Sequence, residues 1–276
     1  MNYNPFLFLN SSQPIGIFDS GIGGLTVANA IHKLLPSESL IYYGDTAHFP
    51  YGDKSPEAIS AYSKGVAEFL LTKNCKAIVI ACNTASSLGF DTVKKLVGNS
   101  IPVINVIDPV IELIRSRKDL HKVGVIGTRG TIKSKVYEHK LLGLNQDLQV
   151  QTLATPLLAP MIEEGFFNNN ISKTIIHSYL SRPKLKKIDA IVLACTHYPL
   201  IKPEIVAYYK DKVEIIDNAQ VAAIYTKKKL AELNLLSNAE KPKYLFYVSD
   251  FTTSFQNSTK VFFVDKVNLE LKNIWK

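Results

Sequence analysis

A long-range internal repeat is the feature that most constrains how this chain can fold. Segments 77–87 (AIVIACNTASS) and 190–200 (AIVLACTHYPL) are both short apolar runs that stop at a cysteine followed by polar residues. Three further pairs keep the same order along the chain: GIFDSGIGGLT with GVIGTRGTIK, DTAHFPYG with ATPLLAPMIEEG, and NVIDPVIEL with EIIDNAQVAAI. A single such match is weak, but four collinear matches predict a duplicated structural unit.

The alternation of strand and helix patterns within each unit indicates the type of fold. Short β-branched runs such as PIGIF, LIYYG and AIVIA alternate with helical patterns over 25–35 and 55–73. This alternation is typical of parallel strands joined by crossover helices. We therefore predict an α/β protein with two similar parallel-sheet domains related by a pseudo-twofold duplication, with the active site in the cleft between them.

The positions of the repeats also predict domain limits. We expect the chain to cross between the halves near residue 105 and again near residue 217. The first domain is then discontinuous, comprising 1–104 and 217–276, and carries Cys82. The second domain comprises 105–216 and carries Cys195.

Bulk composition excludes several classes of protein. An apolar content of 46% over 276 residues is ample for a packed core, and no uninterrupted apolar run is long enough for a membrane span. The start of the chain lacks the pattern of a secretion signal, so we expect a cytoplasmic protein with no membrane association. The net charge of +8 comes from lysines spread along the sequence, which favours a solvated surface over a nucleic-acid interface.

The two repeated cysteines indicate the chemistry. In parallel sheets, ligands bind beyond the carboxyl ends of the strands, where Cys82 and Cys195 are both expected. A thiolate is a good base, and two thiols on opposite walls of a cleft can remove a Cα proton and deliver another to the opposite face. This arrangement suits a two-base racemase. No lysine stands out as a Schiff-base site, so no pyridoxal cofactor is expected.

Polar residues around these cysteines fit such a site. Asn83, Thr84 and Thr196 adjoin the thiols at predicted helix starts, where they can hold a carboxylate. Ser20 and Thr128 follow strands in the first repeat pair. Asp19 and His197 are close enough in sequence to these motifs to tune the two thiols.

At this point the chain resembles the glutamate racemases of the aspartate/glutamate racemase family. The motifs IFDSGIGGLTV, GDTAHFPYGDKS, VIACNTAS, GTRGT and ACTHYPL carry the resemblance and cover nearly the whole chain, except the residues before the first strand. It implies racemisation of L-glutamate to D-glutamate for peptidoglycan synthesis, and thus for the bacterial cell wall and cell shape, without pyridoxal phosphate or metal. The implied catalytic residues are Cys82, Cys195, Asp19, His197 and Glu163.

The resemblance also implies substrate contacts and partners. The implied substrate-binding residues are Ser20, Pro50, Tyr51, Gly52, Asn83, Thr84, Thr128, Thr131 and Thr196. Some members of the family look to be controlled by a cell-wall precursor, and some have been linked to DNA gyrase. A homodimer is expected.

Other functions remain open from the sequence. An aspartate racemase, a hydantoin racemase or a maleate isomerase would also use two opposed cysteines, and pocket size decides among them. A protein whose main task is to bind a partner such as gyrase is a different class of alternative, but it would gain nothing from the cysteine pair.

Several of these residues are also compatible with purely structural roles. Cys75 is expected to be core packing. A zinc site of Cys82, Cys195 and His197 lacks the usual ligand spacing, and DSGIGGLT lacks the glycine that completes a dinucleotide-binding loop. Glu163 sits beside Glu164, and either can be a solvated helix residue. Asp108 and Asp217 are expected to cap or turn at strand ends, without a catalytic role.

Overall fold

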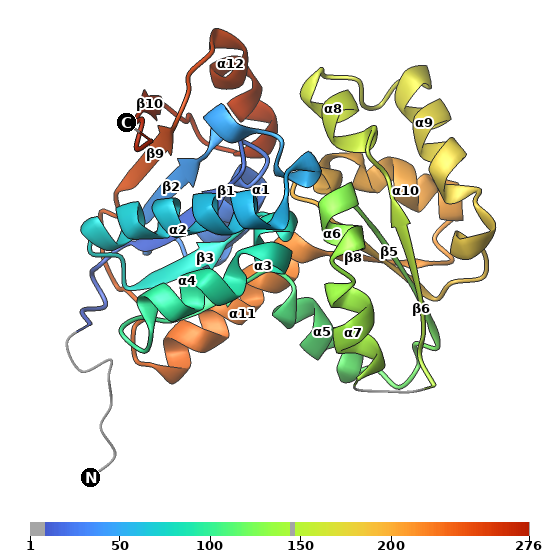
Figure 1. Cartoon of the computed structure of the whole chain (residues 1–276), viewed down its shortest axis with the longest axis horizontal. Helices are drawn as coiled ribbons and strands as arrows, with labels where there is room; N and C mark the ends of the chain where they lie inside the picture. Colours follow the sequence, from blue (N-terminus) through green and yellow to red (C-terminus); the bar gives the residue numbers. More distant parts are fainter. Residues whose placement is uncertain (1–8, 144–146, 276) are drawn as a thin grey trace.

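The computed structural model describes residues 9–143 and 147–275, and it contains two all-parallel sheets (Figure 1). Most of the segment before the first strand, residues 1–8, lies outside the described residues. The first sheet has the order β10-β9-β2-β1-β3-β4 and the second β6-β5-β7-β8. The strands of the first sheet are β1 (Ile15–Asp19), β2 (Leu40–Gly44), β3 (Ala77–Ile80), β4 (Val103–Asn105), β9 (Tyr244–Val248) and β10 (Leu269–Leu271). Those of the second are β5 (Lys122–Gly127), β6 (Gln149–Ala154), β7 (Ala190–Ala194) and β8 (Glu214–Asp217).

The two sheets share one topology, as the repeat predicts. The order β2-β1-β3-β4 in the first sheet corresponds to β6-β5-β7-β8 in the second. The registers agree as well, because Phe18 pairs with Ile80 across β1 and β3, and Ile126 pairs with Leu193 across β5 and β7. The predicted fold class is therefore confirmed. β9 and β10 extend the first sheet alone and were not predicted from the sequence.

Helices cover the strands and connect them. In the first half of the chain these are α1 (Leu25–Leu34), α2 (Pro56–Thr72), α3 (Asn83–Leu88), α4 (Phe90–Val97), α5 (Asp108–Arg115), α6 (Arg129–Lys133) and α7 (Val136–Leu142). In the second half they are α8 (Leu158–Glu163), α9 (Asn170–Leu180), α10 (Lys202–Tyr209), α11 (Asn218–Glu232) and α12 (Thr253–Phe262). Single 3-10 turns lie at Thr46–His48, Tyr51–Asp53, Pro183–Leu185 and Tyr198–Ile201.

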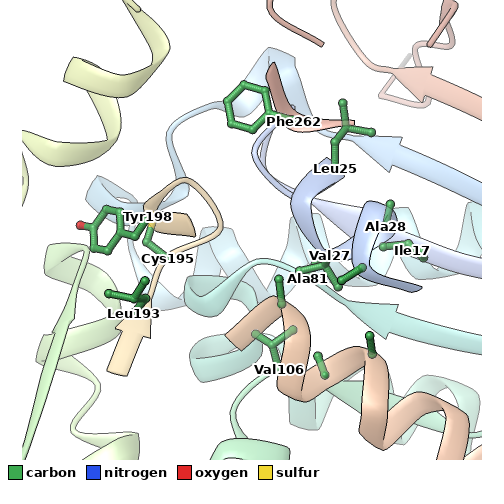
Figure 2. Packing of buried hydrophobic residues seen from close by; sticks show 14 of the residues in the cluster. Ile17, Leu25, Val27, Ala28, Ala81, Val106, Leu193, Cys195, Tyr198 and Phe262 are labelled. Atoms are coloured by element: carbon green, nitrogen blue, oxygen red, sulfur yellow. The ribbon is translucent and has the colours of Figure 1, made fainter. Parts of the chain in front are cut away.

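Central strands are buried throughout, as expected where helices cover both faces of a parallel sheet. Every residue of β1, β3 and β7 is buried. One apolar cluster contains residues of both sheets. Figure 2 shows Leu193, Cys195 and Tyr198 from β7 and the turn after it, together with Ile17 of β1 and Ala81, which follows β3. Cys75 is buried in another cluster, in agreement with its interpretation as core packing.

The chain passes from one sheet to the other after β4 and returns after β8. The helix that follows β8, α11, packs against α1 of the first domain, where Figure 1 shows it in orange. The domain limits at 104/105 and 216/217 stay a prediction.

The two aspartates at these crossings differ. Asp217 caps α11 by accepting the N–H of Ala219 at 2.9 Å, as predicted. Asp108 is instead the first residue of α5, and its carboxylate pairs with Asn105 and Lys140.

Among the described residues, no helix is both long enough and apolar enough to cross a membrane.

Candidate active site

A pocket with about 560 Å³ of empty space, counting the part open to solvent, lies where loops of the two domains meet. Loops at the carboxyl ends of β1, β2, β3, β5, β6 and β7 contribute to it, as expected for parallel α/β sheets. Its lining includes the predicted residues Ser20, Pro50, Tyr51, Gly52, Cys82, Thr84, Thr128, Thr196 and His197. The predicted residues outside this lining are Asp19, Asn83, Thr131, Glu163 and Cys195.

Cys82 lies between the end of β3 and the first residue of α3. Its Sγ accepts the backbone N–H of Ala85 at 3.4 Å and donates to Oγ of Ser20 at 3.8 Å. Burial, and next the negative charge of Asp19, raise the pKa of the Cys82 thiol to about 12. The thiol is therefore held in its protonated form at neutral pH.

Asp19 ends β1 directly beneath this wall and is completely buried. Its Oδ2 accepts the N–H groups of Gly21 at 3.2 Å and Gly24 at 3.0 Å. A Cβ on Gly24 would lie 2.4 Å from the Cβ of Asp19, so only glycine permits this close approach. Burial raises the pKa of Asp19, while the positive charge of His197 and the N–H donors act against the increase.

Cys195 follows β7, directly before the lining residues Thr196 and His197, and has different neighbours from Cys82. Its Sγ lies 3.7 Å from Nδ1 of His197, and Nε2 of His197 lies 2.7 Å from Oε1 of Glu163. Burial disfavours the charged imidazole, but the hydrogen bonds and charges of Cys195 and Glu163 outweigh it and raise the pKa of His197 to about 10. Cys195, His197 and Glu163 thus form a continuous chain of proton-carrying groups.

A cluster of threonine hydroxyls joins the two walls. Oγ1 of Thr84 lies 2.9 Å from Oγ1 of Thr128 and 3.2 Å from that of Thr131. On the other side of the pocket, Thr196 donates to Oδ1 of Asp19 at 3.5 Å. These contacts link the first domain to the second next to the two thiols.

Asn83 is not part of the pocket lining, and its buried Nδ2 has no hydrogen-bond partner among the described residues. Its Oδ1 accepts hydrogen bonds from Tyr137 and from Nδ2 of Asn218, both at 2.8 Å. It therefore connects the Cys82 wall with α7 and with the start of α11.

Several lining residues were not predicted from the sequence: Phe49, Asp53, Arg129, Thr155, Pro156, Ala159, Pro160 and Tyr198. Arg129 pairs with Asp53 at 3.1 Å across the mouth of the pocket, and Thr155 shares a 2.7 Å hydrogen bond with Tyr198. Thr155 stands in the segment ATPLLAP, whose place in the repeat after a strand was the signal that could have identified it.

Within residues 9–143 and 147–275, no group of three or more His, Cys, Asp or Glu side chains is arranged so that it could hold a metal ion.

The family model for Asp/Glu/Hydantoin racemases matches residues 24–226, and the chain belongs to that family. It is an amino-acid racemase and hence an isomerase, which confirms the assignment made from the sequence motifs.

Individual relatives agree with this family. A glutamate racemase of Geobacter metallireducens is 40% identical over 244 residues, covering 88% of this chain and 90% of the relative. The crystal structure of glutamate racemase from Francisella tularensis in complex with D-glutamate superimposes with a TM-score of 0.90 at 38% identity, covering 96% of this chain and 99% of that one. The Escherichia coli glutamate racemase, solved with L-glutamate and the activator UDP-MurNAc-Ala, is similar in fold, with a TM-score of 0.72 at 24% identity over 91% of this chain and 95% of that one.

Proposed function

We propose that this protein interconverts L-glutamate and D-glutamate, with Cys82 and Cys195 as the two acid/base groups and without a cofactor. The observation that carries the proposal is the equivalent position of the two thiols, each at the carboxyl end of the matching strand, β3 or β7, of a duplicated domain. The relatives named above, which are glutamate racemases, support glutamate as the substrate.

The reaction balances with two thiols and no other reagent. One cysteine, as its thiolate, removes the Cα proton, and the other, as its thiol, donates a proton to the opposite face of the planar intermediate. The configuration inverts, and the two sulfurs exchange their protonation states. The protonated state of Cys82 makes it the donor in the direction that begins at Cys195.

Neighbouring groups complete the proton transfer. His197 contacts Sγ of Cys195 and pairs with Glu163, so in its protonated form it can donate a proton to that sulfur and later take it back. On the other wall, burial holds the proton on Cys82, and the charge of Asp19 adds to that effect. We assign these two residues to the control of the thiols and Glu163 to the support of His197.

Hydrogen-bond donors would stabilise the carbanion-like intermediate. Hydroxyl groups of Ser20, Thr84, Thr128 and Thr196 line the pocket, and the Pro50–Gly52 loop forms part of its wall. Fixed donors of this kind lower the energy of charge that develops on a carboxylate during proton removal. Thr131 is hydrogen-bonded to the lining residue Thr84, and Oδ1 of Asn83 is held by Tyr137; both residues stay candidates for substrate contact.

The biological setting is part of the same proposal. D-glutamate would supply peptidoglycan synthesis in the cytoplasm, and the enzyme would work as a homodimer. The activator bound to the Escherichia coli relative supports control by a cell-wall precursor. Sedimentation of the purified protein with and without such a precursor tests the dimer and the effector together.

The decisive experiment is incubation of L-glutamate with the purified protein in heavy water, without pyridoxal phosphate, followed by chiral chromatography and mass spectrometry. We expect D-glutamate that carries deuterium at Cα. Racemisation of aspartate with glutamate left unchanged would assign the chain to a sister activity of the family. Absence of exchange with glutamate, aspartate and their amides would contradict the proposed function.

A further inference from the structure

The C-terminal segment reaches a buried carboxylate behind the pocket. Asp45 follows β2, is completely buried, and begins the loop that continues into the pocket-lining residues Phe49–Asp53. Nε1 of Trp275 donates to its Oδ1 at 2.7 Å, although 230 residues separate the two in sequence. Figure 1 shows this end of the chain beside β9 and β10 on the first domain.

Asp45 organises the pocket loop through its other hydrogen bonds. Its Oδ2 accepts the hydroxyl of Tyr51 at 2.7 Å and lies 2.9 Å from Nδ1 of His48. Oγ of Ser249 donates to Oδ1 at 2.8 Å. A buried carboxylate needs such a complete set of donors, and its position then fixes that of every donor around it. Because Tyr51 lines the pocket, Asp45 is hydrogen-bonded directly to a side chain of this wall.

The indole ring also packs against the same loop. Trp275 meets the ring of His48 edge-on at 4.8 Å and that of Tyr62 at 5.6 Å, and His48 stacks on Tyr62 at 3.9 Å. Gly65 on α2 leaves room for the indole, since a Cβ there would lie 2.6 Å from it. The side chain therefore contacts the loop through both its ring and its N–H group.

We propose that Trp275 is a positioning residue for the racemase reaction: its indole N–H fixes Asp45, and Asp45 fixes the Phe49–Asp53 wall of the pocket. The proposal rests on the proposed function for its kinetic consequences. It assigns a role in the reaction to a residue near the end of the chain that does not line the pocket.

Trp275→Phe keeps one aromatic ring but removes the N–H donor to Asp45 together with part of the indole that packs on Gly65, so it is paired with a variant that removes a donor and no ring. A 1 Å misplacement of substrate-positioning groups can lower the rate about 10²-fold. For a smaller shift of the loop we expect kcat/KM for glutamate to fall about tenfold, through both a higher KM and a lower kcat. Ser249→Ala removes another donor to the same carboxylate and should reproduce the effect. Tyr209→Phe, which loses a 3.3 Å hydrogen bond to Leu185 in the second domain, is the matched control and should keep wild-type kinetics.

Hydrogen exchange provides a readout that does not depend on activity. Amides of 45–53 should exchange about tenfold faster in Trp275→Phe than in the wild-type protein, whereas those of 190–196 on the opposite wall should not change. Trp275 is the single tryptophan of the chain, so the tryptophan fluorescence reports on this position alone. Because the indole contacts the pocket loop, glutamate should alter the fluorescence of the wild-type protein in a saturable way.

The outcomes separate the two proposals. Unchanged exchange in 45–53, or kinetics within twofold of wild type in both Trp275→Phe and Ser249→Ala, would overturn the positioning role while glutamate racemisation stands. A wild-type protein that racemises no glutamate overturns the proposed function, and the exchange experiment still decides whether Trp275 fixes the loop.

Discussion

The two walls of the pocket start from the same sequence pattern and end in different chemistry. Cys82 leads into the helix α3, and its sulfur accepts a backbone N–H at the start of that helix. Cys195 leads into a turn that brings His197 back to its own sulfur. The first wall has a buried carboxylate, Asp19, near its thiol, whereas the second has a protonated imidazole held by Glu163.

This difference shows what the duplication preserved. Each thiol lies at the carboxyl end of its strand in both domains. The residues that follow the cysteine then determine which groups contact its sulfur: a backbone N–H at the start of α3 for Cys82, and His197 for Cys195. Two identical walls would give both thiols the same preference for the proton. Unlike partners let one thiol be poised to donate when the other is poised to accept, as a two-base reaction requires.

The largest expected effect comes from removing either thiol. Cys82→Ala and Cys195→Ala should each lower racemisation by about 10³-fold or more, because one face of the substrate loses its acid/base group. Each variant should still exchange the Cα proton of one enantiomer with solvent, and the two variants should retain opposite enantiomers. NMR of L- and D-glutamate in heavy water measures this exchange.

Circular dichroism of both cysteine variants controls for folding. If both variants exchange the same enantiomer, the two thiols do not face opposite sides of the substrate. Turnover that survives in either variant would exclude the two-thiol mechanism.

His197→Asn should weaken the Cys195 wall selectively. We expect kcat/KM to fall about 10²-fold, equally for both enantiomers, because L- and D-glutamate have the same free energy in water. The selectivity should appear in the exchange of the Cα proton with solvent that occurs without inversion. The rate of this exchange should fall for the enantiomer that gives its proton to Cys195 and stay near wild type for the other enantiomer. Glu163→Gln should act in the same direction with a smaller effect, and equal slowing of both exchanges would contradict this assignment.

Asp19→Asn should change the Cys82 wall by a smaller factor. Loss of the negative charge lowers the pKa of Cys82 from about 12, although burial still holds it above that of an exposed thiol. Alkylation of Cys82 should therefore reach its half-maximal rate at lower pH, and kcat/KM should fall about tenfold. The exposed Asp91→Asn on α4 is the control, and an unchanged alkylation profile in Asp19→Asn would show that Asp19 does not act on this thiol.

The smallest expected effect concerns stability against pH. The folded protein raises the pKa of His197 from 6.5 to about 10, so it binds a proton that the unfolded chain releases. The resulting stability is fully present below about pH 6.5 and is lost as the pH rises toward 10. Denaturant unfolding between pH 6.5 and 9 should show a decline of a few kcal/mol at most, since each pKa unit corresponds to about 1.4 kcal/mol.

His197→Asn should flatten this decline, and the exposed His139→Asn should leave it unchanged. Measurements stop at pH 9 because the raised pKa of Cys82 adds a further loss above that value. A wild-type slope in His197→Asn would mean that another group carries the extra proton.

Local sequence patterns were sufficient for the core of both domains. The apolar runs at 77–81 and 190–194, and the helical patterns between strands, predicted the parallel sheets and the thiols at their ends. They did not predict that β9 and β10 would extend the first sheet beyond β2, because the sheet that a strand joins depends on the neighbouring strand as well as on its own residues.

The sequence by itself determined where the chain makes strands and helices, and that two cysteines end equivalent strands, because periodicity and repetition are properties of neighbouring residues. Only the tertiary structure decided which groups surround those cysteines. The approach of Thr196 to Asp19 joins positions 177 residues apart, and that of Trp275 to Asp45 joins positions 230 apart. Such contacts depend on how the two domains and the C-terminal segment pack, and no local pattern encodes that packing.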